Sequence, residues 1–362
     1  MRDDRRVGKP VSPFTGRDAE RGVLRSALLD ADAGRPAFVL LGGDAGAGKT
    51  RLLQEFTAEA GIGGRTVVLG ACVPSGDFGL AYLPVIDVLR QVEDDDVGRE
   101  VLRAEVAHRP ALGRLVPHLA DGLLPPEPED VGGTAGSPGS LPLGDGLQQV
   151  QLFEAVHRVL LALADRATVV LVVEDVHWAD RSTRDLLAVL ARTPRTGRVM
   201  VVASYRTDDL NRRHPLRPLL AELGRLPGVQ RLLLPAFSRA ELAVLLDGAA
   251  GTPVAADRLE EIFRRSEGNA FFAEELLRAT EPDPAGPGDV SMPATRGRSA
   301  LSSRRAELPD QLADLLLGRV QELPPEGKVV LRLAAVAGRR VTTRVLAAAA
   351  QDSALIHRAG SC

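Results

Sequence analysis

The chain has 362 residues, which is enough for two or three domains rather than one small core. Hydrophobic residues make up 44% of it and charged residues 26%, as in an ordinary globular protein, and the formal net charge is -3. This charge argues against a chain that binds nucleic acid over its whole surface, and an aromatic content of 3% argues against a base-stacking platform.

The cysteines and the first residues of the chain indicate the cellular compartment in which the protein works. Cys72 and Cys362 stand far apart and form no CxxC pair, which argues against a zinc site of the usual spacing and against a disulfide framework. Residues 1–10 are charged and lack the apolar stretch of a signal peptide. No apolar run reaches the roughly 18 residues that a membrane span needs. We therefore expect a soluble, cytoplasmic protein with no membrane partner.

Strands and helices are predicted to alternate over the first two thirds of the chain. In chain order the patterns predict a disordered start (1–13), a helix (20–29), a strand (37–41), a helix (52–60), a strand (66–69), weaker helices (84–119), a loop rich in Pro, Gly and Ser (121–146), a helix (147–164), a strand (168–173), a helix (185–190), a strand (199–204), a helix near residue 219 and a strand (230–234). This alternation predicts an α/β fold, a parallel sheet with helices on both faces. From residue 235 to 279 the pattern is helical only, and a last helical block spans 308–350.

A glycine-rich loop follows the first predicted strand. The Walker A pattern GxxxxGK[ST] is matched at every fixed position by Gly43, Asp44, Ala45, Gly46, Ala47, Gly48, Lys49 and Thr50. In such a loop the backbone N–H groups and the helix N-terminus bind phosphates, the lysine contacts the β- and γ-phosphates and the hydroxyl contacts Mg²⁺. An ordinary glycine-rich turn is the alternative, but the strand before the loop and the helix after it favour a P-loop. We predict an ATP and Mg²⁺ site that extends to Arg51.

Two adjacent acids end the strongly apolar strand at 168–173. Glu174 and Asp175 form a Walker B pattern, in which one carboxylate serves the metal and the other orients the attacking water. By position Glu174 falls on the metal side and Asp175 on the catalytic side, whereas residue type argues the reverse, and both assignments stay open. The predicted metal ligands are Thr50, Glu174 and Asp175. A strand that simply ends in solvated charges is the alternative.

Arg206 follows the predicted strand at 199–204. In the ATPase class that has a strand between the P-loop and Walker B strands, this edge faces the γ-phosphate, so Arg206 is a candidate catalytic sensor of that phosphate. A surface arginine after a strand is the competing interpretation.

These motifs occur with others that are together specific to a family. Phe14-Thr15-Gly16-Arg17 with Glu20 resembles the GRExE motif of STAND-class, Orc-like AAA ATPases. The segment EDVHWAD at 174–180 resembles the EDLHWAD of the large ATP-binding LuxR-type regulators. Residues 82–84 resemble the YLP segment of these regulators, and residues 205–208 resemble their YRTDE segment. Residues 267–276 resemble their GNPFFVEEL segment, and residues 308–338 resemble the start of their winged helix. The resemblance covers nearly the whole chain from residue 14 to about residue 350.

The resemblance implies an ASCE/AAA-type P-loop ATPase domain (14–236, with a flexible insert at 121–146), a helical lid (237–280), a linker (281–306), a partial winged helix (307–351) and a tail (352–362). It also implies that the adenine is bordered by Phe14, Gly16, Arg17, Gly268 and Asn269. Ala270 replaces the proline of the family's GNP motif.

The resemblance implies an ATP-binding, slowly hydrolysing switch module of a signal-responsive transcriptional regulator. In the family a sensor array and a DNA-binding region follow, and this sequence stops before them, so we expect a fragment or a chain that needs a partner for output. We expect possible self-association and no specific DNA binding by the chain alone. The alternatives are a P-loop phosphotransferase or other ATP-dependent enzyme, and a non-hydrolysing ATP-binding scaffold or cyclase- or kinase-associated regulatory module.

Overall fold

The computed structural model of the chain describes residues 14–74, 81–117, 146–192, 196–279, 317, 320 and 325–337. The chain divides into two compact units, Met1–Phe271 and Phe272–Cys362. Outside the described residues lie the predicted disordered start (1–13), the linker (281–306), the tail (352–362), all of the insert (121–146) except its last residue, and most of the predicted winged helix (307–351).

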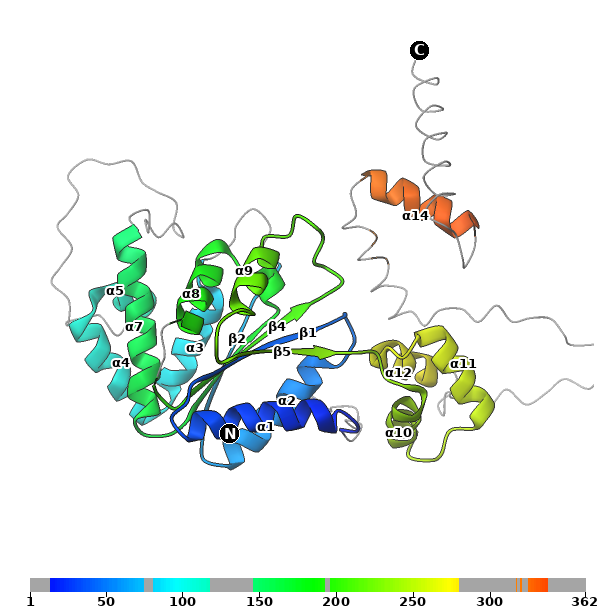
Figure 1. Cartoon of the computed structure of the whole chain (residues 1–362), viewed down its shortest axis with the longest axis horizontal. Coiled ribbons are helices and arrows are strands. Elements are labelled where there is room, and N and C mark those ends of the chain that lie inside the picture. Colours follow the sequence, from blue (N-terminus) through cyan, green and yellow to red (C-terminus); the bar gives the residue numbers. More distant parts are fainter. Residues whose placement is uncertain are drawn as a thin grey trace, which may run out of the picture. The chain divides into compact units, whose positions relative to one another are not determined.

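The first unit is built on a five-stranded parallel sheet (Figure 1). Its strands are β1 (Ala37–Gly43), β2 (Thr66–Ala71), β3 (Val169–Glu174), β4 (Val199–Arg206) and β5 (Val229–Leu234). They lie in the order β2-β3-β4-β1-β5, and every neighbouring pair is parallel. The strand that leads into the Walker A loop is therefore separated by β4 from β3, and the two acids lie at the end of β3. This is the order of the ATPase class on which the Arg206 prediction was based.

Helices cover both faces of this sheet. The described helices are α1 (Asp18–Asp32), α2 (Lys49–Ile62), α3 (Leu83–Asp94), α4 (Asp96–His108), α5 (Pro110–Gly113), α7 (Gly146–Ala164), the 3-10 turn η1 (Val176–Trp178), α8 (Arg181–Arg192), α9 (Leu216–Leu223), α10 (Arg239–Ala250), α11 (Ala256–Ser266), α12 (Ala270–Arg278) and α14 (Pro325–Ala337). The predicted fold class, an α/β P-loop sheet with helices on both faces, is confirmed.

Alternation along the strands explains the two layers. Phe38 and Leu40 of β1 belong to the core shared with α3, α4, α5, α7, α8 and α9, whereas Val39 and Leu41 belong to the core shared with α1 and α2. Because successive strand residues point to opposite faces, a strand buried on both faces reads as a continuous apolar run. That is why the predicted strands lack the polar alternation of a half-exposed sheet. All seven residues of β1 are buried, so the strand holds the Walker A loop rigidly.

The carboxyl ends of the parallel strands position the site. β1 ends at Gly43, β3 at Glu174 and β4 at Arg206, so the Walker A loop, the acid pair and the candidate sensor meet at one edge of the sheet. In the second unit the described residues are the rest of α12, Ala279, Leu317, Val320 and the helix α14. No helix in the described ranges has the length and apolar character of a membrane span.

Candidate nucleotide-binding site

The Walker A loop joins β1 directly to α2. Gly48, the residue before α2, has φ of 93°, a conformation that residues with a Cβ rarely adopt. Beyond Gly48 and its two chain neighbours, no heavy atom lies within 4 Å of the position that a Cβ would occupy there. The loop thus presents an open backbone surface at the N-terminus of a 14-residue helix, where N–H groups have no partner within the helix.

Lys49 is folded back onto its own loop. Its Nζ donates hydrogen bonds to the carbonyl oxygens of Gly43, at 2.7 Å, and Asp44, at 2.9 Å. The side chain is buried, and desolvation lowers the pKa of the ammonium while the charge of Asp175 opposes that shift. The lysine therefore presents a weakly hydrated positive charge beside the loop.

Thr50 and Glu174 are brought together across 124 residues of sequence. The Thr50 hydroxyl donates to Glu174 Oε2 at 2.9 Å. Burial raises the pKa of the Glu174 carboxyl, and the Thr50 hydrogen bond acts in the opposite direction. A hydroxyl and a carboxylate oxygen side by side are the ligand types that Mg²⁺ prefers, and Mg²⁺ sites use few protein ligands because phosphate and water supply the rest.

Asp175 adopts a left-handed backbone conformation, with φ of 56°. Its N–H donates to the hydroxyl of Ser204 on β4 at 3.1 Å, which ties the turn after β3 to the neighbouring strand. Asp175 Oδ1 lies 3.9 Å from Nε of Arg206, and the Arg206 guanidinium lies over the ring of Trp178, 4.7 Å from its centroid. The two acids therefore face different partners: Glu174 the Walker A hydroxyl, and Asp175 the candidate sensor.

His177 is buried behind this pair. Its Nε2 lies 3.3 Å from Asp209 Oδ2 and its Nδ1 lies 3.7 Å from Asp175 Oδ1, although neither ring nitrogen makes a hydrogen bond to any described residue. Burial lowers the pKa of the imidazole to about 4, so His177 is neutral at pH 7. Its ring packs against Trp178, with centroids 4.5 Å apart. His177 is thus an uncharged support for the acidic turn.

The segment after β4 binds the first half of the Walker A loop. Ala45 N donates to Asp208 Oδ1 at 3.2 Å, and the Thr207 hydroxyl donates to the carboxylate of Asp44. Thr207 N also donates to the carbonyl of Gly43 at 3.3 Å. The sequence prediction named neither Thr207 nor Asp208 as a site residue. The signal was available, because both lie in the YRTD segment directly after Arg206.

Arg17 anchors the loop from the other side. Its guanidinium donates to the carbonyl oxygens of Ala47, at 3.1 Å, and Pro235, at 2.7 Å, and lies 4.0 Å from the ring centroid of Phe237. Gly16 packs against the same ring. Arg17 is 4% exposed, and its Nη1 also donates to Glu20 Oε1 at 3.1 Å. Its charge is therefore paired with Glu20 and with backbone carbonyls rather than directed at solvent. Phe237 was missed in the sequence prediction, although it follows the last strand at the edge where the site forms.

The segment 268–271 also contacts the Walker A loop. Asn269 Nδ2 donates to Ala45 O at 2.7 Å, and Phe271 N donates to Gly46 O at 3.2 Å. A Cβ on Gly268 would lie 2.2 Å from the carbonyl oxygen of Phe237, so only glycine allows this approach. The GN segment is thereby fixed beside the loop.

The remaining residues named from the sequence are Ala270, Arg51 and Phe14. Ala270 is the first residue of α12, a position that also tolerates proline, so the departure from the GNP motif leaves this helix start intact. Arg51 lies in the first turn of α2, next to Thr50. Phe14 packs on the core under α1 and α2, and the Arg21 guanidinium lies 5.4 Å from its ring centroid. Phe14 thus lies against the core and Arg21, whereas the structure brings Gly16, Arg17, Gly268 and Asn269 together beside the loop.

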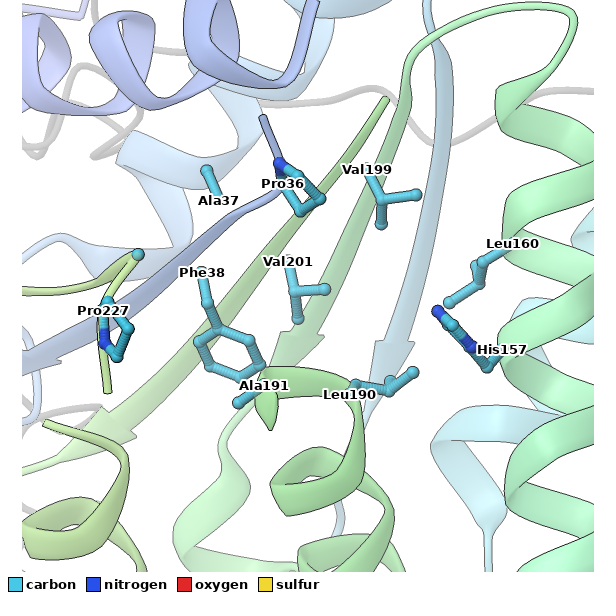
Figure 2. A pocket seen from close by; sticks show the side chains of 11 residues that line it. Pro36, Ala37, Phe38, His157, Leu160, Leu190, Ala191, Val199, Val201 and Pro227 are labelled. Carbon is cyan, nitrogen blue, oxygen red and sulfur yellow. The ribbon is translucent and has the colours of Figure 1, made fainter. Parts of the chain in front are cut away.

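A small cavity lies at the opposite edge of the sheet (Figure 2). It has a volume of about 30 Å³ and is lined by residues at the starts of β1 and β4, by Leu160 and His157 of α7, and by the end of α8. The lining is mainly apolar, and His157 Nε2 is buried without a hydrogen-bond partner among the described residues. The length of β1 separates this cavity from the Walker A loop, and its volume suits water rather than a nucleotide.

The chain is similar in sequence to a known domain family and to a longer protein. A family model described as an AAA ATPase domain matches residues 13–202. An uncharacterised protein of Rhizobium meliloti (strain 1021) is 28% identical over 355 residues, which are 95% of this chain and 32% of that protein. The chain thus spans about a third of the length of this relative.

Several solved structures resemble the chain at low sequence identity. A Walker-type ATPase of Pyrococcus abyssi is 13% identical, with a TM-score of 0.43 over 75% of this chain and 69% of that one. A Signal Transduction ATPase with Numerous Domains (STAND) protein with a tetratricopeptide repeat sensor, from Pyrococcus horikoshii, is 14% identical, with a TM-score of 0.42 over 93% and 36%. The Drosophila origin recognition complex bound to DNA contains a chain that is 15% identical, with a TM-score of 0.48 over 97% and 76%.

The family assignment rests on the match to the AAA ATPase domain model, which spans more than half of the chain and includes both Walker motifs. AAA ATPase domains bind nucleotide, and the edge where β1, β3 and β4 end carries the phosphate loop and the acids that this activity needs. The chain belongs to the AAA ATPase domain family.

Proposed function

We propose that the chain binds Mg-ATP at the Walker A loop, hydrolyses it slowly and acts as the switch module of a signal-responsive transcriptional regulator. The observation that carries the nucleotide part is the hydrogen bond from Thr50 to Glu174, which joins the Walker A helix to the end of the Walker B strand. The regulatory part rests on the resemblance of residues 14–20 to STAND-type AAA ATPases and of residues 174–180 and 205–208 to LuxR-type regulators.

The residues at this edge fit Mg-ATP. The open backbone at Gly48 and the buried ammonium of Lys49 suit phosphate oxygens. Thr50 and Glu174 supply the oxygen ligands for Mg²⁺, with Glu174 on the metal side. In this proposal Gly16, Arg17, Gly268 and Asn269 shape the adenine side, Arg17 and Asn269 acting through the loop backbone that they bind.

Asp175 is the proposed general base, with its role distinct from that of Glu174. A water oxygen bonds to the γ-phosphorus while the bond from that phosphorus to the β–γ bridging oxygen breaks, and the water proton passes to the Asp175 carboxylate. Arg206, beside Asp175, offsets the charge that develops on the transferred group. The products are ADP and inorganic phosphate.

Thermal unfolding tests nucleotide binding. At 100 times its dissociation constant a ligand adds about 2.7 kcal/mol to the free energy of unfolding. For a unit of this size we expect the midpoint to rise by roughly 5–10 °C in millimolar Mg-ATP. Lys49→Ala should lose the shift, while Lys328→Ala, the same substitution on α14, should keep it. An unchanged wild-type melting curve, or an equal shift in Lys49→Ala, contradicts the proposal.

Turnover separates the two acids. Asp175→Asn should bind Mg-ATP and fail to hydrolyse it, whereas Glu174→Gln should lose the dependence of binding on Mg²⁺. If Glu174→Gln binds normally and is the inactive variant, the two roles are exchanged. Turnover should be slow and should change when a regulatory partner is added. Fast turnover that scales with a small acceptor molecule would instead indicate a phosphotransferase, and binding with no turnover a scaffold.

A further inference from the structure

Two arginines flank the Walker A loop, and the structure holds them in different ways. Arg17 is 4% exposed and donates two hydrogen bonds to backbone carbonyls, so it is fixed. The side chain of Arg206 is 28% exposed. Its ion pairs to Asp175 and Asp209, at 3.9 Å and 3.7 Å, are longer than hydrogen bonds. Charge attraction and the face of Trp178, rather than directional bonds, therefore hold Arg206.

Asp209, the third residue after Arg206, is one of the two acids that pair with it. Its Oδ2 lies 3.7 Å from Arg206 Nη1 on one side and 3.3 Å from His177 Nε2 on the other. Arg206 lies within 4 Å of both Asp209 and Asp175. Two carboxylates thus attract one guanidinium toward the acidic turn.

The backbone of Arg206 is already next to the phosphate loop. In the sheet register Arg206 pairs with Gly43, the first residue of the Walker A motif. The N–H of the next residue, Thr207, donates to the carbonyl oxygen of Gly43 at 3.3 Å. The backbone of Arg206 therefore already lies beside the loop, and what differs in the proposal below is the partner of its side chain.

We propose that Asp209 is a positioning residue that holds Arg206 against Trp178, away from the γ-phosphate position, until a triphosphate competes for the arginine. The inference rests on the proposed binding of Mg-ATP at the Walker A loop. Its consequence is specific to the third phosphate: Asp209 weakens the binding of a triphosphate and leaves that of a diphosphate unchanged, because ADP has no group that reaches Arg206.

Nucleotide titrations of the full chain test this. The ligands are Mg-ADP and the Mg²⁺ complex of a slowly hydrolysed ATP analogue, and the variants are Asp209→Asn and Asp209→Glu. We expect Asp209→Asn to bind the triphosphate roughly three- to tenfold more tightly than wild type, with ADP affinity unchanged. Asp209→Glu keeps the charge and should restore the wild-type ratio. Asp185→Asn is the control, since it removes the same charge from a pair with Arg181 of similar length, 3.8 Å, on α8.

Trp178 gives a second readout without turnover, because it is the only tryptophan in the chain. Its fluorescence should change when wild type binds the triphosphate and not when it binds ADP. Asp209→Asn should show part of that change without nucleotide. Tighter binding of both nucleotides, tighter binding of neither, or equal fluorescence responses to both would overturn the role of Asp209. Absence of any nucleotide binding by wild type would instead overturn the proposed function, so the two failures are distinguishable.

Discussion

Replacing Arg17 by methionine should destabilise the first unit strongly, although Arg17 was predicted as a nucleotide-contacting residue. Methionine keeps an apolar stem against Phe237 and, like arginine, carries a Cβ at the left-handed φ of 63°. The substitution therefore removes the guanidinium without relieving the backbone. What is lost is the pair of charge-assisted hydrogen bonds to the carbonyl oxygens of Ala47 and Pro235, together with the ion pair to Glu20 at 3.1 Å.

The expected loss in the free energy of unfolding follows from those contacts. Hydrogen bonds to a charged group contribute about 1.5–3 kcal/mol each, and the cation–π contact adds about 1 kcal/mol. Neighbouring contributions are not additive, so we expect a loss of about 4 kcal/mol. This is a large share of the roughly 5–15 kcal/mol that stabilises a typical domain.

Urea unfolding of the full chain, followed by Trp178 fluorescence and circular dichroism, measures the loss. With a slope of about 3 kcal/mol per molar urea, the midpoint should fall by roughly 1.3 M. Arg21→Met is the matched control. Arg21 lies on the same helix and pairs with Glu59 at 3.4 Å near the surface, so its loss should cost at most about 1 kcal/mol. Equal midpoints for the two variants would falsify the assignment of Arg17 as the anchor of the Walker A loop.

Two further predictions concern stability. Asp180 precedes α8 and accepts hydrogen bonds from Thr183 N at 3.1 Å, from the Thr183 hydroxyl, and from Tyr82 N at 3.3 Å. Asp180→Ala should therefore cost about 2–3 kcal/mol in urea unfolding, and Asp180→Asn much less; a neutral alanine variant would refute this capping role. The Arg65 guanidinium lowers the pKa of Asp32 through a two-pronged contact with a shortest distance of 2.7 Å. Since the folded pKa lies below the unfolded value, this stabilisation is present above about pH 4 and is lost as the pH falls through the folded pKa. Asp32→Asn should cost about 1 kcal/mol at pH 6, and this difference should shrink as the pH falls below about 4. A pH-independent difference would contradict the ion-pair explanation.

Local patterns determined much of this molecule. The Walker A loop is a short run whose glycines, lysine and threonine define a strand–loop–helix unit. The strand before it and the helix after it can be predicted without knowledge of the rest of the chain. The apolar runs at 37–41, 168–173 and 199–204 likewise predicted buried parallel strands, because strands covered on both faces carry few polar residues. The α/β fold and the position of β4 between β1 and β3 followed from these patterns and from the family resemblance.

Tertiary structure alone decided which side chains serve the site and which serve its scaffold. The contacts of Arg17 with Pro235 and of Asn269 with Ala45 join residues 218 and 224 positions apart. No local pattern encodes such pairs, because they depend on where β5 ends and on the path of the chain through α10 and α11. Asp208 and Asp209 are adjacent acids in the sequence, yet one accepts the Ala45 N–H and the other faces Arg206. That difference arises because consecutive residues after a strand point in different directions, and only the packed sheet edge determines what each one meets.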